Sequence, residues 1–323
     1  SLMRMICLRK NKTLYCLILL LPYLNPYNLS AQPNEIKFDH LSLEHGLSQN
    51  SVNCILQDRK GFMWFGTQDG LNKYDGYDFT VYKNRPENPN SLSDSRVTVL
   101  FESQAGMLWI GTDGGGLNKF DRTTDVFTHY KNEPGNPTSL SNNRIRAIFE
   151  DQSGNLWIGT DGGGLNKFDR QRGTFARYNA EYNNPQNLPL NNIADICEAR
   201  PGWIWLATSQ GGLIAFDPQN LIFRQFKNEP LDPNSLSHNS VSAIHRDEAG
   251  VVWVGTFGGG LNKLVLSPGS FGKGLAPGDG KYPPVFSRYL HRANDPNSLS
   301  DNRIRTVHED RVADRILVQV QLV

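Results

Sequence analysis

The chain has 323 residues, with 33 lysines and arginines against 32 aspartates and glutamates, for a formal net charge of +1. This length is enough for one large domain with a sizeable core. The near balance of charge argues against the basic surface that nucleic-acid binding needs, so no nucleic-acid partner is expected.

The first 31 residues have the pattern of a secretory signal peptide. Basic residues, among them Arg4 and Arg9, precede an apolar run from Leu14 to Leu24. This run is short for crossing a bilayer, so we expect cleavage after Ala31, with an uncleaved anchor as the alternative. The sequence therefore predicts export to the periplasm or another extracytoplasmic compartment.

A repeated block dominates the rest of the chain. The segment LWIGTDGGGLNKFDR occurs unchanged at Leu108 to Arg122 and at Leu156 to Arg170, with weaker copies at Met63 to Tyr74, Ile204 to Phe216 and Val252 to Leu264. The anchoring tryptophans are separated by 45, 48, 48 and 48 residues and are Trp64, Trp109, Trp157, Trp205 and Trp253. This period matches one four-stranded propeller blade and exceeds the roughly 34 residues of common helical repeats.

Each unit predicts four short strands, and the third unit is the clearest. Its strands are expected at Arg144–Glu150, Leu156–Thr160, Leu165–Asp169 and near Thr174–Tyr178. A glycine three residues before each tryptophan predicts a hairpin position with positive φ, at Gly61, Gly106, Gly154, Gly202 and Gly250. One blade cannot bury both faces of its own sheet, so its apolar residues must pack against neighbouring blades. We therefore predict an all-β fold, a β-propeller of four-stranded antiparallel blades.

The repeats place a partial propeller at residues 36–310. Its units are about 45–90, 91–138, 139–186, 187–234 and 235–297, with an incomplete sixth at 298–310. Ala313 and Ile316 replace the expected turn glycine and tryptophan, so the sixth blade is expected to stop after its first strand. Residues 311–323 are then an aberrant tail, which a truncation or a reading-frame change in a longer gene would produce. Ile36 to Leu43 resembles the outer strand of a blade whose other strands are absent. The insertion Ser267 to Pro284 is interpreted as a surface loop, with a lid as the alternative.

Several patterns that resemble chemical sites have simpler structural explanations. The GTDGGGLNK segments lack the Gly-Lys-Ser/Thr ending of a phosphate-binding loop, and no helix follows them, so they are interpreted as turns. The aspartates lack the ligand spacing of a calcium loop. No HExxH pair and no GxSxG elbow occurs. We expect no catalytic residues, no metal and no cofactor.

The start of each first strand carries polar residues that differ between units. The first such position holds Ser51, Arg96, Arg144, Asn192, Ser240 and Arg303, and the position two residues later holds Asn53, Thr98, Arg146, Ala194, Ser242 and Arg305. First strands usually line the channel of a propeller, so these side chains are expected at its mouth, where they could hold hydroxyls or a carboxylate. Solvated strand ends are the alternative. The predicted ligand-binding residues are Arg96, Arg144, Arg146, Asn192, Arg303 and Trp203, the last being a tryptophan outside the repeat pattern.

At this point the sequence resembles a known family. The turn glycine, tryptophan, Ile-Gly-Thr and Gly-Gly-Leu-Asn-Lys-Phe-Asp resemble the two-component regulator propeller repeat, over about residues 36 to 310. The resemblance implies an exported sensor region, often two consecutive seven-bladed rings, followed by a β-sandwich, a membrane helix and a cytoplasmic output. That output is commonly a histidine kinase, and hybrid members are associated with detecting glycan fragments. The shared positions are structural, so no ligand-binding residue carries over.

The resemblance and the residues together predict a function. They favour the extracytoplasmic ligand-sensing propeller of a hybrid two-component histidine kinase, which binds a glycan or another small ligand and has no catalytic output of its own. The expected partners are a small-molecule or oligosaccharide ligand, the membrane helix and kinase of the parent, and a second copy in a homodimer. The alternatives are the sensor region of a diguanylate cyclase, a secreted protein-interaction scaffold, and a propeller lyase or hydrolase.

Overall fold

The computed structural model describes residues 41–179, 191–266, 284–310 and 315–320. The predicted signal peptide at residues 1–31 lies outside the described residues, as do the insertion up to residue 283 and the first five residues of the predicted outer strand at 36–43. Among the last residues of that segment, Leu43 begins a short 3-10 helix, η1 (Leu43–His45).

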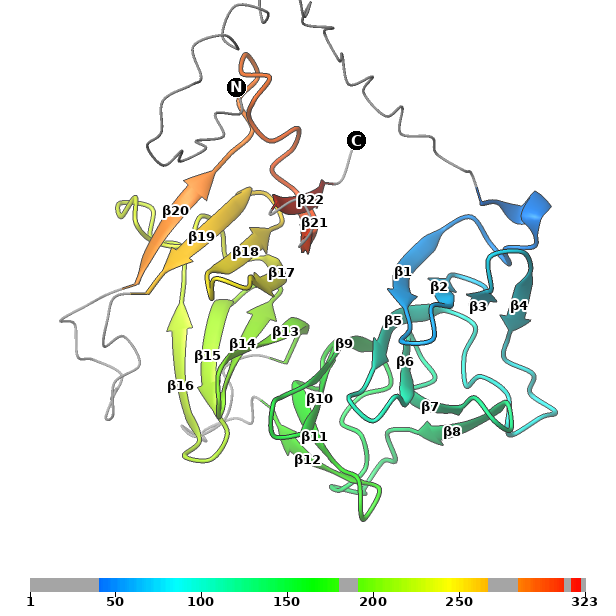
Figure 1. The fold of residues 1–323 in the computed structure, drawn as a ribbon. Coiled ribbons are helices and arrows are strands. Elements are labelled where there is room, and N and C mark those ends of the chain that lie inside the picture. Colours follow the sequence, from blue (N-terminus) through cyan, green and yellow to red (C-terminus); the bar gives the residue numbers. More distant parts are fainter. Residues whose placement is uncertain (1–40, 180–190, 267–283, 311–314, 321–323) are drawn as a thin grey trace, which may run out of the picture. The chain divides into compact units, whose positions relative to one another are not determined.

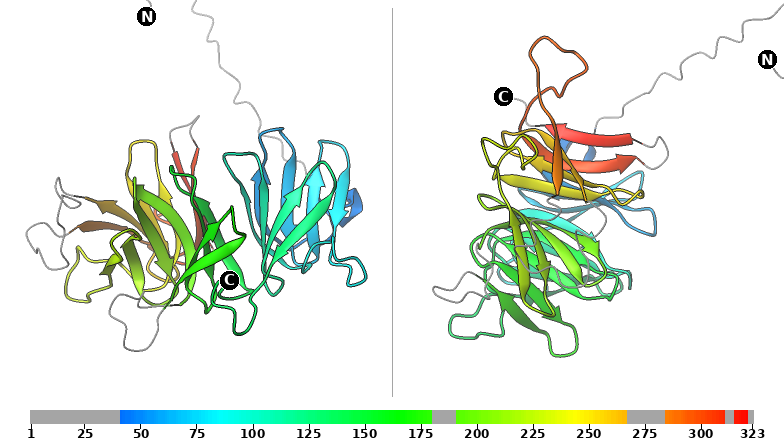
Figure 2. Two further views of the ribbon diagram at one scale, coloured as in Figure 1. Left: turned by 90° about the horizontal axis from the view of Figure 1, so that it is seen from below. Right: turned by 90° about the vertical axis from the view of Figure 1, so that its left-hand side faces the viewer.

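Five antiparallel four-stranded sheets follow one another along the chain, each built from four consecutive strands (Figure 1). Blade 1 consists of β1 (Val52–Gln57), β2 (Met63–Thr67), β3 (Gly70–Tyr74) and β4 (Phe79–Tyr82), and blade 2 of β5 (Val97–Glu102), β6 (Leu108–Thr112), β7 (Leu117–Asp121) and β8 (Val126–Tyr130). Blade 3 consists of β9 (Ile145–Glu150), β10 (Leu156–Thr160), β11 (Leu165–Asp169) and β12 (Thr174–Tyr178), and blade 4 of β13 (Ile193–Arg200), β14 (Trp203–Thr208), β15 (Gly212–Asp217) and β16 (Ile222–Phe226). Blade 5 consists of β17 (Val241–Arg246), β18 (Val252–Thr256), β19 (Leu261–Val265) and β20 (Val285–Tyr289). Figure 2 shows the strands of each sheet side by side in two further views. The predicted all-β propeller fold is confirmed.

The third blade agrees closely with the strands predicted from its sequence. Three of its four strands have the predicted bounds, and the first begins one residue later, at Ile145. The turn glycine Gly154 has a φ of 79°, and its counterparts in the other four blades also have positive φ. This left-handed conformation strains any residue with a Cβ, which is why a glycine recurs three residues before each tryptophan.

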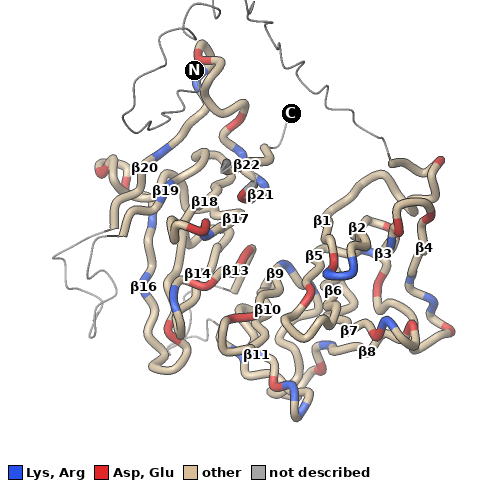
Figure 3. Tube along the Cα trace, viewed as in Figure 1, with Lys and Arg blue, Asp and Glu red and all other residues tan. Residues whose placement is uncertain are grey.

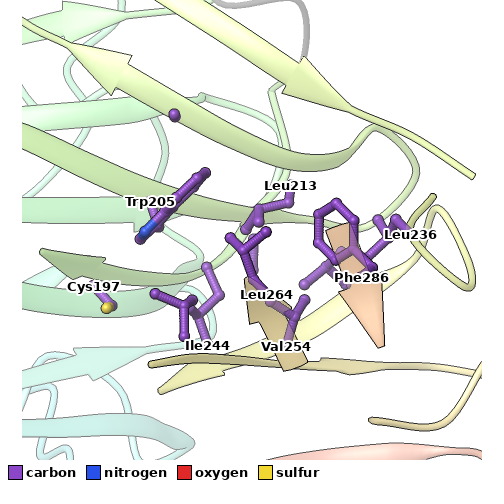
Figure 4. Close-up of a cluster of buried hydrophobic side chains, with 12 residues drawn as sticks. Cys197, Trp205, Leu213, Leu236, Ile244, Val254, Leu264 and Phe286 are labelled. Carbon is purple, nitrogen blue, oxygen red and sulfur yellow. The ribbon is translucent and has the colours of Figure 1, made fainter. Parts of the chain in front are cut away.

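The core lies between neighbouring blades. Four of the repeat tryptophans are at most 2% exposed, and Trp253 is partly buried. Trp157 of blade 3 packs with Ile196 and Phe216 of blade 4. Figure 4 shows the next interface, where Trp205 and other side chains of blade 4 pack with apolar side chains of blade 5. The repeat tryptophans therefore contribute to the core between the blades.

First strands of successive blades contact one another, from β1 with β5 through to β17 with β21 (Ile304–Asp310). This is the arrangement expected when the first strand of each blade lies nearest the propeller axis. The residues at the start of each first strand therefore lie where neighbouring blades approach most closely.

The sixth unit continues past its first strand. Strand β21 pairs with β22 (Arg315–Val320), and His308 lies opposite Leu317, as His245 lies opposite Trp253 in blade 5. The expectation that this blade stops after one strand is therefore wrong, because apolar residues at alternate positions, Ile316 and Val318 among them, suffice for a strand without the repeat tryptophan. The interpretation of residues 311–323 as an aberrant tail stays a prediction.

An aspartate six residues before the tryptophan anchors the indole in three blades. The indole nitrogens of Trp64, Trp157 and Trp253 each donate a hydrogen bond of 2.8 Å to Asp58, Asp151 and Asp247, respectively. Blade 2 has Ser103 at this position, and the buried Trp109 Nε1 has no acceptor among the described residues. A buried donor without an acceptor destabilises the folded state.

Substituting Ser103→Asp is expected to raise the free energy of unfolding by about 1 kcal/mol, because it gives Trp109 Nε1 the acceptor that three other blades have. The new carboxylate would also accept the backbone N–H of Met107, which Ser103 Oγ now accepts at 3.1 Å. Urea denaturation followed by tryptophan fluorescence measures the change. A variant less stable than the wild type would contradict this account of the aspartate.

Both cysteines among the described residues are free thiols, as the sequence indicates. Cys197 is buried and Cys54 is partly buried, and loss of water around each thiol raises its pKa to about 12. At neutral pH both therefore remain protonated and weakly reactive.

Blade 4 carries one carboxylate where the other blades have apolar side chains. Asp195 occupies the repeat position of Val99, Ala147 and Ala243. Its carboxylate accepts the backbone N–H of Ile196 and, across the blade interface, that of Ile244, each at 2.8 Å. Loss of water around the carboxylate outweighs these bonds and raises the pKa of Asp195 to about 6.

The raised pKa of Asp195 predicts a pH-dependent stability. The folded chain binds this proton more tightly than the unfolded chain, so the contribution of Asp195 to stability is full below the ordinary aspartate pKa of about 4 and is lost as the pH rises through about 6. Asp195→Asn is expected to remove this component and to be more stable than the wild type at pH 8. Thermal unfolding of both proteins across this pH range measures the difference, and parallel curves would refute the assignment.

Candidate functional site

Three of the predicted ligand-binding arginines lie together at the starts of the first strands of blades 2 and 3. Arg96 directly precedes β5, Arg144 directly precedes β9, and Arg146 is the second residue of β9. Two aspartates lie among them, each directly after the second strand of its blade: Asp113 follows β6 and Asp161 follows β10. We call these five residues the arginine cluster.

Ion pairs join the members of the arginine cluster. Arg96 Nη1 lies 2.8 Å from Asp113 Oδ2. Arg144 bridges both acids, with Nε 3.3 Å from Asp113 Oδ1 and Nη2 3.2 Å from Asp161 Oδ2. Arg146 Nη2 lies 2.8 Å from Asp161 Oδ2 and 3.7 Å from Asp113 Oδ1. The shared aspartates therefore hold three like-charged side chains next to one another.

The arginines of the cluster are more exposed than the aspartates. The side chains of Arg96, Arg144 and Arg146 are 57%, 50% and 38% exposed, whereas those of Asp113 and Asp161 are 11% and 27% exposed. Three positive and two negative charges leave a surplus of one positive charge. Figure 3 shows a basic segment beside β9.

The glycine-rich turns fix the aspartates in place. Asp161 donates its backbone N–H to the carbonyl of Arg144 at 2.9 Å, which places the acid beside the start of β9. Thr160 Oγ1 donates to the Gly164 carbonyl at 2.8 Å and accepts the N–H of Gly163 at 3.1 Å. A Cβ on Gly163 would lie 2.4 Å from Ser141 Oγ, so only glycine fits there. These segments are turns, as predicted.

Three of the polar residues at the second position of the predicted mouth have a structural contact instead. The side chains of Asn53, Thr98 and Ser242 donate to first-strand carbonyls of the next unit, those of Val97, Ile145 and Ile304, at 2.8, 2.7 and 2.6 Å. They connect neighbouring blades. Arg146 occupies the same repeat position in blade 3 but pairs with the aspartates instead.

The remaining predicted ligand-binding residues do not join the arginine cluster through their side chains. Asn192 forms a backbone bridge with Asp161. Arg303 pairs with its own neighbour Asp301 at 2.7 Å and holds the pKa of that carboxyl at about 2. Trp203 begins β14, at the end of the β13–β14 hairpin opposite to Asn192, and packs against the core between blades 4 and 5. The structure therefore brings together three of the six predicted residues, and the ligand-binding role of all six stays a prediction.

Sequence reasoning missed the two aspartates as members of the site. The sequence identifies Asp113 and Asp161 only as turn residues. Asp113 lies 31 residues before Arg144, so the sequence does not show that the two side chains meet. The available signal is their place directly after Ile-Gly-Thr in blades 2 and 3, where blades 4 and 5 carry Ser209 and Phe257.

Hollows among the described residues also lie away from the cluster. One, of about 510 Å³, lies over β11 and β12 and is lined by charged residues that include Lys167, Arg170 and Arg172. Another, of about 430 Å³, lies between blade 5 and the sixth unit and is lined by Trp253, Ile316 and others.

The described part of the chain offers no group of three or more His, Cys, Asp or Glu side chains placed to hold a metal ion. Within the same residues, no helix is long and apolar enough to cross a membrane.

Five four-stranded blades that pack through their first strands define the chain as a β-propeller protein. Four of its segments, residues 46–69, 91–114, 139–162 and 235–258, match the family described as two component regulator propeller. These four segments are therefore similar to the repeat of that family. The matched segments lie at the starts of blades 1, 2, 3 and 5.

Comparison with known proteins gives relatives of greater length. "Histidine kinase P4" of Formosa agariphila is 47% identical over 66 residues, which make up 20% of this chain and 5% of that protein. The extracellular domain of a protein described as a hybrid two component system of B. thetaiotaomicron has a TM-score of 0.64 at 24% identity, covering 87% of this chain and 40% of that one. PorZ of Porphyromonas gingivalis, described as a surface component of the type-IX secretion system, has a TM-score of 0.59 at 17% identity, covering 84% and 39%. These structural similarities show the propeller fold alone.

Proposed function

We propose that the chain is the extracytoplasmic ligand-sensing propeller of a hybrid two-component histidine kinase, and that it binds a glycan or another small ligand without converting it. The observation that carries this proposal is the match of four segments to the two component regulator propeller. The relative named as a histidine kinase and the extracellular domain of the B. thetaiotaomicron system support the same direction.

Signalling would arise from differential binding. A ligand changes the output only if it binds one arrangement of the parent protein more tightly than another. The blades present strand ends with polar side chains on a sheet scaffold, and such an arrangement suits selective recognition of a ligand. We also propose that the amino-terminal segment is an export signal. The proposed partners are a membrane helix and a kinase elsewhere in the parent, and a second copy in a homodimer that transmits the change.

The chemistry of the arginine cluster suits binding better than catalysis. Guanidinium groups stay protonated at all physiological pH values, so Arg96, Arg144 and Arg146 cannot exchange protons as a general acid or base. The carboxylates of Asp113 and Asp161 lie within ion-pair distance of these arginines and hold them in place. A fixed array of guanidinium groups is suited to holding a ligand.

The test is a titration of the full chain with a panel of neutral and acidic oligosaccharides by calorimetry, followed by chromatography of the recovered sugar. The proposal expects saturable binding of one class of ligand and recovery of that ligand intact. Shortened or unsaturated sugar products would establish a hydrolase or lyase instead. Absence of binding to the whole panel, together with tight binding of a folded protein partner, would favour the scaffold.

A further inference from the structure

We infer that the arginine cluster binds an oxyanion, either a carboxylate or a sulfate ester, carried by a sugar ligand. This inference rests on the proposed function for the sugar, and on the geometry of blades 2 and 3 for the oxyanion.

The ion pairs leave much of the donor capacity of the cluster unused. A guanidinium has three nitrogens and five N–H groups. Among the described residues, the ion pairs engage one nitrogen of Arg96, two of Arg144 and one of Arg146. The planar fork of arginine matches the two oxygens of a carboxylate or sulfate, which makes bidentate binding favourable.

The aspartates of the arginine cluster are more buried than the arginines, so an approaching ligand meets positive charge first. Asp113 is 11% exposed, whereas Arg96 and Arg144, which pair with it, are 57% and 50% exposed. The aspartates thus lie beneath the arginines and hold them side by side, so their mutual repulsion is offset before a ligand arrives. An approaching anion meets guanidinium groups that are already in place, which lowers the entropy cost of binding.

The three arginines are 38–57% exposed, and the two aspartates with which they pair are more buried. Water still solvates the guanidinium groups, so their ion pairs contribute modestly to folding. Blades 4 and 5 hold their strand ends without such groups: they have Asn192 and Ser240 at the first position and no acid in the following turn. The strand ends are thus charged in blades 2 and 3 and neutral in blades 4 and 5. They would suit a ligand that places its acidic group over blades 2 and 3 and its hydroxyls toward the neutral residues.

The experiment titrates the full chain with two matched pairs of sugars and follows the arginine Nε–Hε signals by NMR. The first pair is sodium glucuronate and glucose, which tests the carboxylate. The second pair is galactose 6-sulfate and galactose, which tests the sulfate ester. The expected result is a saturable shift of the signals of Arg96, Arg144 and Arg146 with at least one acidic sugar, weakened by salt, and no such shift with its neutral partner.

Three variants make the assignment specific. Arg144→Ala is expected to weaken binding of the acidic sugar roughly tenfold, since it removes the guanidinium that bridges both acids. Asp113→Asn is expected to weaken binding, because Arg96 and Arg144 lose the charged partner that holds them side by side. Arg172→Ala is the matched control, because Arg172 is an exposed arginine paired with its own neighbour Asp169. Circular dichroism checks that each variant is folded.

The outcomes separate this inference from the proposed function. Equal shifts with acidic and neutral sugars, unchanged affinity in folded Arg144→Ala, or no saturable shift with either acidic sugar would overturn the oxyanion site. Saturable binding of a neutral oligosaccharide elsewhere on the chain would leave the proposed function standing. Acidic sugar bound through the cluster and then converted to product would support the oxyanion site and overturn the non-catalytic sensor.

Discussion

Asp151→Ala is expected to lower the free energy of unfolding by about 3 kcal/mol, because it removes a buried carboxylate that accepts several hydrogen bonds at once. Asp151 is 7% exposed. It accepts the backbone N–H groups of Ser153 and Asn155 at 3.0 and 2.9 Å, and the indole N–H of Trp157 at 2.8 Å. Alanine would leave the indole donor buried without its acceptor and would loosen the turn before β10.

Urea denaturation of wild type and variant, followed by circular dichroism, measures this loss. Asp169→Ala is the control, because Asp169 also accepts two backbone N–H groups in a turn, those of Gln171 and Arg172, but the turn is exposed. Asp169→Ala is expected to lower the free energy of unfolding by less than about 1 kcal/mol. Equal losses for the two variants would show that contact with the tryptophan adds nothing.

Asn166→Ile is expected to lower the free energy of unfolding by a similar amount, about 3 kcal/mol. The reason is that it removes a buried amide that connects the third strand of the blade to the loop before its first strand. Asn166 is fully buried. Its Oδ1 accepts the N–H of Ser141 at 3.0 Å, and its Nδ2 donates to Ser141 Oγ at 2.8 Å and to the Ile158 carbonyl at 3.4 Å. Isoleucine would leave the N–H and hydroxyl of Ser141 without these partners.

Blade 4 provides the matched reverse substitution. It carries Ile214 at the position of Asn166, and the residue at the position of Ser141 is Pro189, which has no backbone N–H to donate. Ile214→Asn is therefore expected to be destabilising as well, although blades 1, 2, 3 and 5 all carry asparagine there. Thermal unfolding measures both variants. A stabilising Ile214→Asn would show that the serine and asparagine do not act as a pair.

The repeat made the fold predictable from the sequence. Tryptophans at nearly constant spacing fix the length of a blade, and the glycine before each one fixes a hairpin, so strand bounds follow with little error. The sixth unit shows the limit of this approach, since β22 forms without the glycine and the tryptophan. A strand needs alternating apolar residues and a partner, which are weaker requirements than the full repeat motif.

The candidate site was only partly predictable. The position of Arg96 and Arg144 at the starts of first strands followed from the repeat, but their pairing with Asp113 depends on how two neighbouring blades pack. The role of Asn53 as a link to the Val97 carbonyl has the same origin. Trp203 directly follows the turn glycine Gly202, so the repeat already places it at the turn end of the β13–β14 hairpin, away from Asn192.

The most direct test of the sensor assignment measures phosphorylation of the full parent protein in membrane vesicles. The ligand identified by titration is added to the side that carries the propeller, and radiolabelled ATP to the kinase side. The account predicts a saturable change in phosphate incorporation, with a midpoint that matches the binding affinity of the propeller. Saturated binding with unchanged phosphorylation would contradict the account, since the propeller would then bind without sensing.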